Sequence, residues 1–273
     1  MKDYVNFLGV GLNPITYDEL YVKIDNWIKD KEGRSHHIAC VNAYNIALSI
    51  NNKELYRIYN SADVTGADGM PFVRWIRKYN KQACDRIAAP DTILKLAEHA
   101  KTRQYTFYLY GGAPEVCVKM KKYLEDRFPH IQIVGHYSPP FRELTQEEDD
   151  AIVAEINALK PDIVCVGLGT PKQDYWIDTH INKIKGSVLI AAGATFDFFG
   201  GRIKMAPDYI RKSGFEWVYR LFGKDFKRLW KRYIVMYSVF IWNFALQKSK
   251  LVKFNVIEYT RPKTKLLKDS QSF

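Results

Sequence analysis

Cysteines are few in this chain of 273 residues, and none is spaced as a metal site or a redox pair. Cys40, Cys84, Cys117 and Cys165 lie far apart and form no C-x-x-C motif. Cys40 and Cys165 stand within apolar runs, so we expect them to be reduced thiols in the core. This cysteine usage is typical of a reducing compartment.

A long apolar stretch is also missing. The longest run without a charged residue, Tyr233–Gln247, has 15 residues, whereas a membrane-spanning helix needs about 20. Basic residues flank this run on both sides, which predicts an interfacial helix or a terminal helix docked on the protein. Residues 1–4 show no charged segment followed by an apolar core, so we expect no secretion signal.

Metal-binding and dinucleotide-binding motifs are absent as well. The sequence contains no D-x-D motif, and its histidines form no ligand-spaced pair. The acidic cluster at residues 147–150 falls in the first turn of a predicted helix, where carboxylates complement the helix dipole. Gly9-Val10-Gly11 lacks the third glycine of a dinucleotide fingerprint, and Pro14 lies where the helix should run. We therefore expect neither a metal ion nor a cofactor.

Short apolar runs alternate with helical patterns through the first 200 residues. Strands are expected at residues 5–10, 37–41, 63–66, 105–110, 131–134, 162–167 and 188–192. Two of the intervening helices should begin at capping boxes, Thr16 with Glu19 and Thr145 with Glu148. This spacing predicts a Rossmann-like α/β fold, with a mostly parallel sheet covered by helices on both faces.

The net charge of +11 is concentrated near the end of the chain. Residues 1–201 contain 24 Lys and Arg against 25 Asp and Glu, whereas residues 202–273 contain 17 against 5. We therefore predict a Rossmann-like domain at residues 1–201 and a basic, aromatic-rich helical appendage at residues 202–273. The excess points to an anionic partner, which could be a phospholipid surface, a pyrophosphate or a nucleic acid.

Small and polar residues follow three of the predicted strands, at the edge where open α/β sheets bind ligands. The candidate binding residues in these motifs are Gly111, Gly112, Gly169, Thr170, Gly193, Phe196 and Asp197. Glycine lets a ligand approach the backbone, and Thr170 as an N-cap would direct helix N–H groups at a diphosphate. Short βα turns often contain glycine in any case, but together the motifs favour a nucleotide-like ligand.

Asp68 stands on a turn, in the run Ala67–Pro71, directly after a strand-like stretch. A carboxylate there has the exposure of a catalytic group and could accept a proton from an attacking hydroxyl. The same carboxylate could instead cap the helix predicted at residues 69–79. Asn42 and Asn45 also follow a strand, and either hydroxyl binding or helix capping would explain them.

The segment from Arg211 to Arg232 interleaves basic residues with aromatic ones. This pattern suits a membrane headgroup zone or a lipid pyrophosphate. An amphipathic helix packed on the core, with a solvated basic face, would give a similar pattern. The two interpretations are compatible with each other.

Eight stretches together resemble the bacterial WecG/TagA/CpsF glycosyltransferases, and they occur in order across residues 5–235. They are Val41–Asn45, Ala67–Pro71, Gly111–Pro114, Ser138–Phe141, Gly167–Gln173, Gly193–Gly201, Ala206-Pro207 and Phe215–Leu221. So many collinear motifs argue against chance agreement.

The resemblance implies an inverting, metal-independent transfer of a sugar from a UDP-sugar to a sugar on undecaprenyl diphosphate. The sugar would be of the N-acetylmannosamine type or the glucose type, and the product would feed a cell-surface polysaccharide. The proposed base of the family corresponds to Asp68, and Asn42, Arg86 and Gln173 fall at polar pocket positions. Cys40 departs from the pattern, because some members have Thr there, and this bears on the donor pocket.

The resemblance also implies that arginines of the appendage meet the diphosphate and the membrane. Arg220 matches the pattern, whereas Arg228 and Arg232 follow a stretch that departs from it. The expected partners are the UDP-sugar, the lipid-linked acceptor and an anionic membrane surface, with no nucleic acid; homo-oligomerisation stays open. The expected place is the cytoplasmic face of the cell membrane, as a peripheral protein.

A function of another class is a non-catalytic basic adaptor that binds an anionic membrane or a nucleic acid through residues 202–273. It would leave the three strand-end motifs without a purpose. Titration with UDP separates the adaptor from the enzyme.

Overall fold

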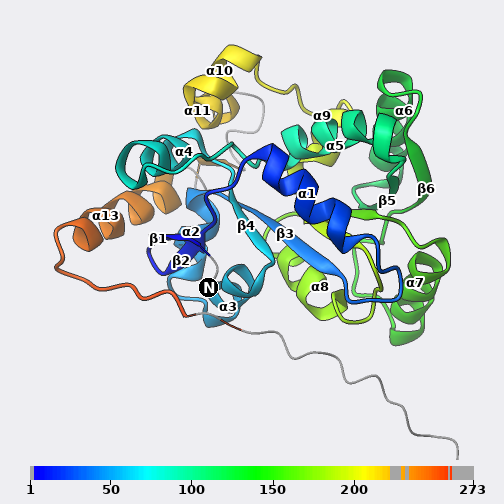
Figure 1. Ribbon diagram of the computed structural model, residues 1–273, viewed down its shortest axis with the longest axis horizontal. Helices are drawn as coiled ribbons and strands as arrows, with labels where there is room; N and C mark the ends of the chain where they lie inside the picture. Colours follow the sequence, from blue (N-terminus) through cyan, green and yellow to red (C-terminus); the bar gives the residue numbers. More distant parts are fainter. Residues whose placement is uncertain (1–2, 222–228, 231–233, 258, 260–273) are drawn as a thin grey trace, which may run out of the picture.

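The computed structural model describes residues 3–221, 229–230, 234–257 and 259 (Figure 1). Its centre is a six-stranded parallel sheet in the order β4-β3-β8-β7-β5-β6. The strands are β3 (His36–Val41), β4 (Val64–Ala67), β5 (Thr106–Gly111), β6 (Gln132–Tyr137), β7 (Ile163–Gly167) and β8 (Val188–Ala191). All six strands expected beyond residue 30 are present, and their carboxyl ends meet at one edge of the sheet.

Both faces of the sheet are buried. Along β7, Ile163 and Cys165 belong to one hydrophobic cluster, whereas Val164 and Val166 belong to another. Successive side chains of a strand point to opposite faces, so a continuous apolar run needs a covering layer on each side. The Rossmann-like α/β fold class is confirmed.

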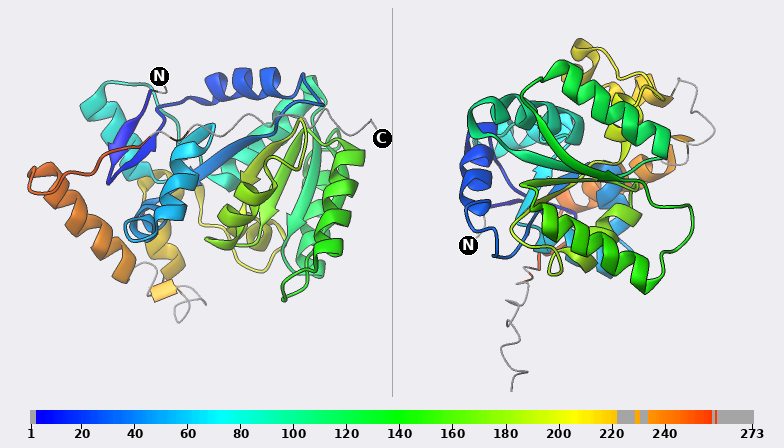
Figure 2. Two further views of the ribbon diagram at one scale, coloured as in Figure 1. Left: turned by 90° about the horizontal axis from the view of Figure 1, so that it is seen from below. Right: turned by 90° about the vertical axis from the view of Figure 1, so that its right-hand side faces the viewer.

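Helices form these two layers (Figures 1 and 2). One layer contains α1 (Tyr17–Trp27), α5 (Ala89–Arg103), α6 (Pro114–Arg127) and α9 (Gly193–Phe199), and the other contains α2 (Ala43–Ser49), α3 (Lys53–Ser61), α7 (Gln146–Leu159) and α8 (Lys172–His180). Both predicted capping boxes are present, at Thr16 with Glu19 and at Thr145 with Glu148. They fix where α1 and α7 begin.

The prediction of one strand at residues 5–10 was wrong, because the chain forms an antiparallel hairpin there. Its strands are β1 (Val5–Phe7) and β2 (Val10–Leu12), and they form a separate two-stranded sheet. Leu8 and Gly9 make the turn with φ of 53° and 87°. Positive φ at both central residues suits the twist of a hairpin. An apolar residue such as Leu8 gives no turn signal, which is why the sequence pattern looked continuous.

Part of the basic C-terminal region packs against the body of the protein. It contains α10 (Asp208–Ser213), α11 (Glu216–Leu221) and α13 (Met236–Lys248). Phe244 of α13 stacks on Phe7 of the hairpin with ring centroids 5.6 Å apart, and Phe240 lies edge-on to Phe72 at 5.4 Å. Figures 1 and 2 show α13 at the end of the molecule remote from α6 and α7. The uncharged run thus forms a docked helix over much of its length.

The helices built from described residues are all too short or too polar to cross a bilayer. The division of the chain at residue 201 stays a prediction. The aromatic contacts of α13 show that the region after this residue shares an apolar interface with the region before it.

Candidate active site

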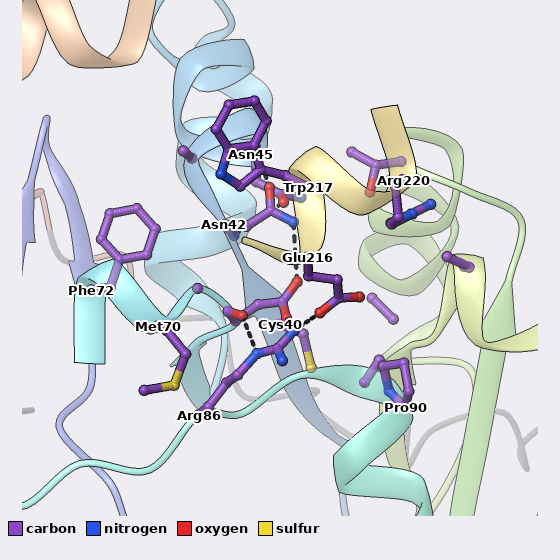
Figure 3. Close-up of a pocket in the computed structure, with 18 of the residues that line it drawn as sticks. Cys40, Asn42, Asn45, Met70, Phe72, Arg86, Pro90, Glu216, Trp217 and Arg220 are labelled. Atoms are coloured by element: carbon purple, nitrogen blue, oxygen red, sulfur yellow. Dashed lines mark hydrogen bonds and ion pairs between the residues drawn. The ribbon is translucent and has the colours of Figure 1, made fainter. Parts of the chain in front are cut away.

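A pocket of about 380 Å³ opens at the carboxyl ends of β3, β4, β7 and β8 (Figure 3). Ligands of open α/β sheets bind at this edge, outside the strand ends. The loops after the four strands line the pocket together with α4 (Met70–Trp75), α11 and α13. The basic C-terminal region therefore completes a pocket that begins at the sheet.

Asp68 follows β4 directly, and its side chain lines the pocket with 22% of its surface exposed. Its backbone N–H donates to the Val41 carbonyl at 2.9 Å, which fixes the residue beside the end of β3. The Asn42 amide donates from Nδ2 to Oδ2 at 3.1 Å, and Arg86 Nη2 lies 3.5 Å from Oδ1. Asp68 does not cap the following helix, because the N-cap residue of α4 is Gly69 and no side chain caps it.

Burial raises the pKa of Asp68 to about 6. The Arg86 guanidinium lowers this pKa, the Glu216 and Asp91 carboxylates raise it, and the hydrogen bond from Asn42 lowers it. The net effect is upward because loss of hydration disfavours the charged form of a carboxyl. Such a group is still largely ionised at pH 7, and it is a stronger base than an ordinary aspartate.

Asn42 both caps a helix and contacts Asp68, so the two roles considered for it coexist. Its Oδ1 accepts hydrogen bonds from the N–H groups of Tyr44 and Asn45 at the start of α2. Asn45 is buried, donates to the Tyr59 hydroxyl at 2.9 Å and accepts from the Asn42 N–H at 3.2 Å. These bonds hold the Asn42 amide with its Nδ2 toward Asp68.

Gln173 ties together the loops that follow β7 and β8. Its Oε1 accepts hydrogen bonds from the N–H groups of Gly169 at 3.1 Å and Gly193 at 2.9 Å. All three residues line the pocket, as predicted residues of a binding site should. Each backbone N–H carries a single proton, so these two N–H groups serve the protein and are not free for a diphosphate.

Thr170 lines the pocket, but its predicted role as the N-cap of the next helix was wrong. The N-cap of α8 is Pro171, and no side chain caps this helix. As an N-cap, the Thr170 hydroxyl would accept a hydrogen bond from the Gln173 N–H. That N–H donates instead to the Gly169 carbonyl at 3.0 Å.

Three arginines line the pocket, and one of them, Arg211 of α10, is held in salt bridges with Asp91 and Asp208. Arg86 precedes α5 and donates from Nε to the Asp68 carbonyl at 2.8 Å and from Nη2 to Glu216 at 2.6 Å (Figure 3). Arg220 lies on α11, with its guanidinium 5.2 Å from the centre of the Phe198 ring. Its buried Nε has no hydrogen-bond partner among the described residues. Arg220 therefore offers a cation that an anionic ligand can use.

Gly111 and Gly112 end β5, which lies on the far side of β7, and they do not line the pocket. A Cβ atom on Gly111 would lie 2.5 Å from the Gly167 backbone, and one on Gly112 would lie 3.1 Å from the Phe196 ring. These glycines therefore allow β5, β7 and α9 to approach closely. Their predicted part in ligand binding is not supported by the position of the pocket.

After Gly193, helix α9 presents different residues to the pocket from those expected. Thr195 and Phe198 line it, whereas Phe196 packs into the core and Asp197 forms a salt bridge with Arg202 at 3.4 Å. Residues three apart share a helix face, and the next residue points elsewhere. Thr195 is 1% exposed, and its hydroxyl has no hydrogen-bond partner within the described ranges. The sequence motif contained Thr195, but the phase of the helix was needed to select it.

Arg228 and Arg232, the other two arginines expected at the site, lie outside the described residues. Glu216 and Trp217 line the pocket from α11. Both lie in the stretch Phe215–Leu221 that carries the family resemblance, but neither was predicted as a site residue. The available signal was an acidic residue within a strongly basic segment.

Comparison with known proteins identifies the family of this chain. Residues 5–253 match the Glycosyl transferase WecG/TagA/CpsF family. An N-acetylglucosaminyldiphosphoundecaprenol N-acetyl-beta-D-mannosaminyltransferase of Staphylococcus aureus strain MW2 is 26% identical over 249 residues, which cover 91% of this chain and 95% of the relative. Proteins of the same description from strains NCTC 8325 / PS 47 and MRSA252 align with the same identity and coverage. Because the family match spans nearly the whole chain, including the pocket, this protein belongs to the WecG/TagA/CpsF family of glycosyltransferases.

Proposed function

We propose that this glycosyltransferase moves a sugar from a UDP-sugar to a sugar carried on undecaprenyl diphosphate, with inversion and without a metal ion. The description of the relatives names an N-acetylmannosaminyl group and a diphosphoundecaprenol-linked acceptor. It supports a donor of the N-acetylmannosamine type. A glucose-type donor is the second option, because Cys40 lines the pocket at a position where some family members have Thr. The product would enter a cell-surface polysaccharide.

The observation that carries this proposal is Asp68, a carboxylate with a pKa of about 6 that lines the pocket beside the strand ends. In the proposed step the acceptor hydroxyl gives its proton to Asp68 while its oxygen attacks the anomeric carbon of the donor. The bond from that carbon to the UDP oxygen breaks, and UDP leaves with the electron pair. Attack from the side opposite UDP inverts the anomeric configuration. A general base typically contributes about 10²–10⁴ in rate.

The leaving diphosphate needs cations and hydrogen-bond donors. Arg220 and Thr195 are suited to this, since both line the pocket and each has an unpaired buried atom within the described structure. Preorganised donors of this kind stabilise charge that develops in the transition state. The glycine motifs predicted that backbone N–H groups would bind the diphosphate. The N–H groups of Gly169 and Gly193 donate to Gln173 instead, so we assign diphosphate binding to Arg220 and Thr195.

An apolar side of the pocket supports a lipid-linked acceptor. Met70, Trp217, Phe240 and Ile241 line it from α4, α11 and α13. Ile241 is 65% exposed and thus extends this side to the molecular surface. We propose that the acceptor lipid leaves the pocket here, at the cytoplasmic face of the membrane.

The test is release of UDP from a panel of UDP-sugars in the presence of a short-chain lipid diphosphate that carries N-acetylglucosamine. We expect release that requires both substrates, is fastest with UDP-N-acetylmannosamine and is unchanged by a chelator. Release in the absence of acceptor, or no release with any donor, contradicts the proposal. The basic-adaptor alternative predicts no release and no binding of UDP.

A further inference from the structure

Three carboxylates share the guanidinium of Arg86. Nη2 donates to Glu216 Oε2 at 2.6 Å and lies 3.5 Å from Asp68 Oδ1, and Nη1 lies 3.8 Å from Asp91 Oδ2. The Arg86, Glu216 and Asp68 side chains are only 17%, 16% and 22% exposed. The shortest contact of this guanidinium is therefore with Glu216 of α11 and not with Asp68.

An aspartate beside an arginine ordinarily forms a charge-assisted pair at about 2.7–2.9 Å, often with both oxygens engaged. Such a pair lowers the pKa of the carboxyl by about 1–3 and occupies the lone pairs that must accept a proton. Asp68 avoids this state, because its contact with Arg86 at 3.5 Å is at the outer limit of a hydrogen bond. Instead, Nη2 of Arg86 donates to Glu216 at 2.6 Å, while Nε donates to the backbone carbonyl of Asp68 at 2.8 Å and not to its carboxylate.

We propose that Glu216 is a positioning residue for the base. By holding Arg86 on the side of α11, it keeps the Asp68 carboxylate out of a tight ion pair and turned into the pocket. Figure 3 shows Glu216 and Arg86 pointing toward each other below α11. Since α11 belongs to the basic C-terminal region, docking of this region and competence of the base are linked.

Other contacts anchor the same region beside the pocket. Arg211 of α10 forms salt bridges with Asp91 and Asp208, and Arg74 Nη2 donates to the Lys212 carbonyl at 3.1 Å. Figure 1 shows α10 and α11 together next to α4. The contact between Glu216 and Arg86 thus belongs to a docked element that several bonds hold in place.

The charged groups that face Asp68 come from separate elements of the described structure. Arg86 comes from the segment before α5, Asp91 from α5 and Glu216 from α11, while Cys40 of β3 and Asn42 are neutral neighbours. Removal of the Glu216 charge acts on Asp68 in two ways. It removes a repulsion from the ionised carboxylate, and it frees Arg86 to approach. Both effects lower the pKa of Asp68.

The first measurement is the pKa of Asp68 by carbon-13 NMR of protein labelled at aspartate, with the signal assigned by its loss in Asp68→Asn. We expect the pKa to fall from about 6 in the natural protein to about 5 or lower in Glu216→Gln. Glu98→Gln removes the same charge from α5, at an exposed residue that does not line the pocket. It should leave the pKa of Asp68 at its natural value.

The second measurement is transfer, and only this arm rests on the proposed function. In Glu216→Gln we expect kcat to fall by about three- to tenfold, because a weaker base removes the proton less well, with KM for the UDP-sugar unchanged. Glu216→Asp, which restores the charge, should recover part of kcat and part of the pKa, and it replaces Glu216→Gln if that variant does not fold. An unchanged pKa of Asp68 in a folded variant overturns the proposal. Absence of transfer in the natural protein overturns the proposed function alone, since the NMR result is independent of substrate.

Discussion

The surroundings of Asp68 suit a base, because burial disfavours its negative charge and no tight ion pair among the described residues neutralises it. Burial raises its pKa to about 6, and Arg86, which also pairs with Glu216, offsets only part of this effect. Its place after β4 could be read from the sequence. Its pKa could not, since Asp91 and Glu216 reach it from distant parts of the chain.

The pH dependence of transfer follows from this environment. The proposed base, Asp68, must be ionised in the free enzyme, so kcat/KM should rise with pH through an apparent pKa of about 6 and level off above it. Initial rates at low donor concentration, measured across this range in buffers of constant ionic strength, provide the check. An apparent pKa near 4 in this profile, the value of an ordinary aspartate, would contradict a raised pKa of Asp68.

The same raised pKa predicts a stability cost. In the unfolded chain Asp68 ionises near pH 4, but in the folded protein it ionises near pH 6. The free energy of unfolding therefore falls as the pH rises from about 4 to about 6, and the full cost is present above pH 6. We expect Asp68→Asn to be more stable than the natural protein by about 1–3 kcal/mol at pH 8. The gain should disappear as the pH falls below about 4. Urea unfolding at both values measures this, and a variant less stable at pH 8 would exclude the predicted cost.

Among the elements, the loops after β7 and β8 depend on one side chain. Gln173 accepts both loop N–H groups and is buried. The glycine motifs were visible in the sequence, and their position at the pocket agrees with the rule for open sheets. That a glutamine of α8 would use their N–H groups was not visible, because it depends on how the two loops meet.

Gln173→Ala should therefore loosen the pocket. Two buried N–H groups would lose their acceptor, which lowers the free energy of unfolding by about 2 kcal/mol or more. KM for the UDP-sugar should rise as the loops move. Gln146→Ala, at an exposed position of α7, is the matched control and should change neither quantity. Equal stability of the two variants would show that the two hydrogen bonds accepted by Gln173 do not stabilise the fold.

Other elements show where sequence patterns succeed and fail. The short apolar runs predicted all six parallel strands, because a strand buried on both faces appears in the sequence as a nearly continuous apolar run. The hairpin around Leu8 was missed, because a positive φ at leucine has no sequence signal. In α9 the motif was found but Phe196 was chosen over Thr195, because the orientation of a short helix depends on its first residue.

At the scale of the whole molecule, one side of α13 carries apolar residues to the surface. Ile234, Ile241 and Trp242 are exposed on this helix and the turn before it, and Lys248 and Lys250 are exposed at its end. Apolar residues beside lysines are typical of helices that lie on anionic lipid. The charge asymmetry of the sequence pointed to an anionic partner, of which a phospholipid surface was one option. It did not indicate that aromatic contacts would hold α13 on the hairpin.

Binding to vesicles tests this surface. Replacement of Ile241 and Trp242 by serine should weaken binding to vesicles rich in phosphatidylglycerol by about tenfold or more, because two large apolar side chains no longer enter the interface. Val22 and Val118 lie on α1 and α6 with 60% and 53% exposure, and their double replacement by serine is the matched control. Equal flotation of the two variants, or preferential binding to duplex DNA, would exclude the membrane surface.

The most direct measurement of the whole account is the rate of sugar transfer by Asp68→Asn near pH 8, with both substrates saturating. Loss of the base should lower kcat by at least about 100-fold, while the affinity for UDP and the folded structure are retained. A rate within about threefold of the natural enzyme would show that another group removes the proton, and the mechanism built on Asp68 would be wrong.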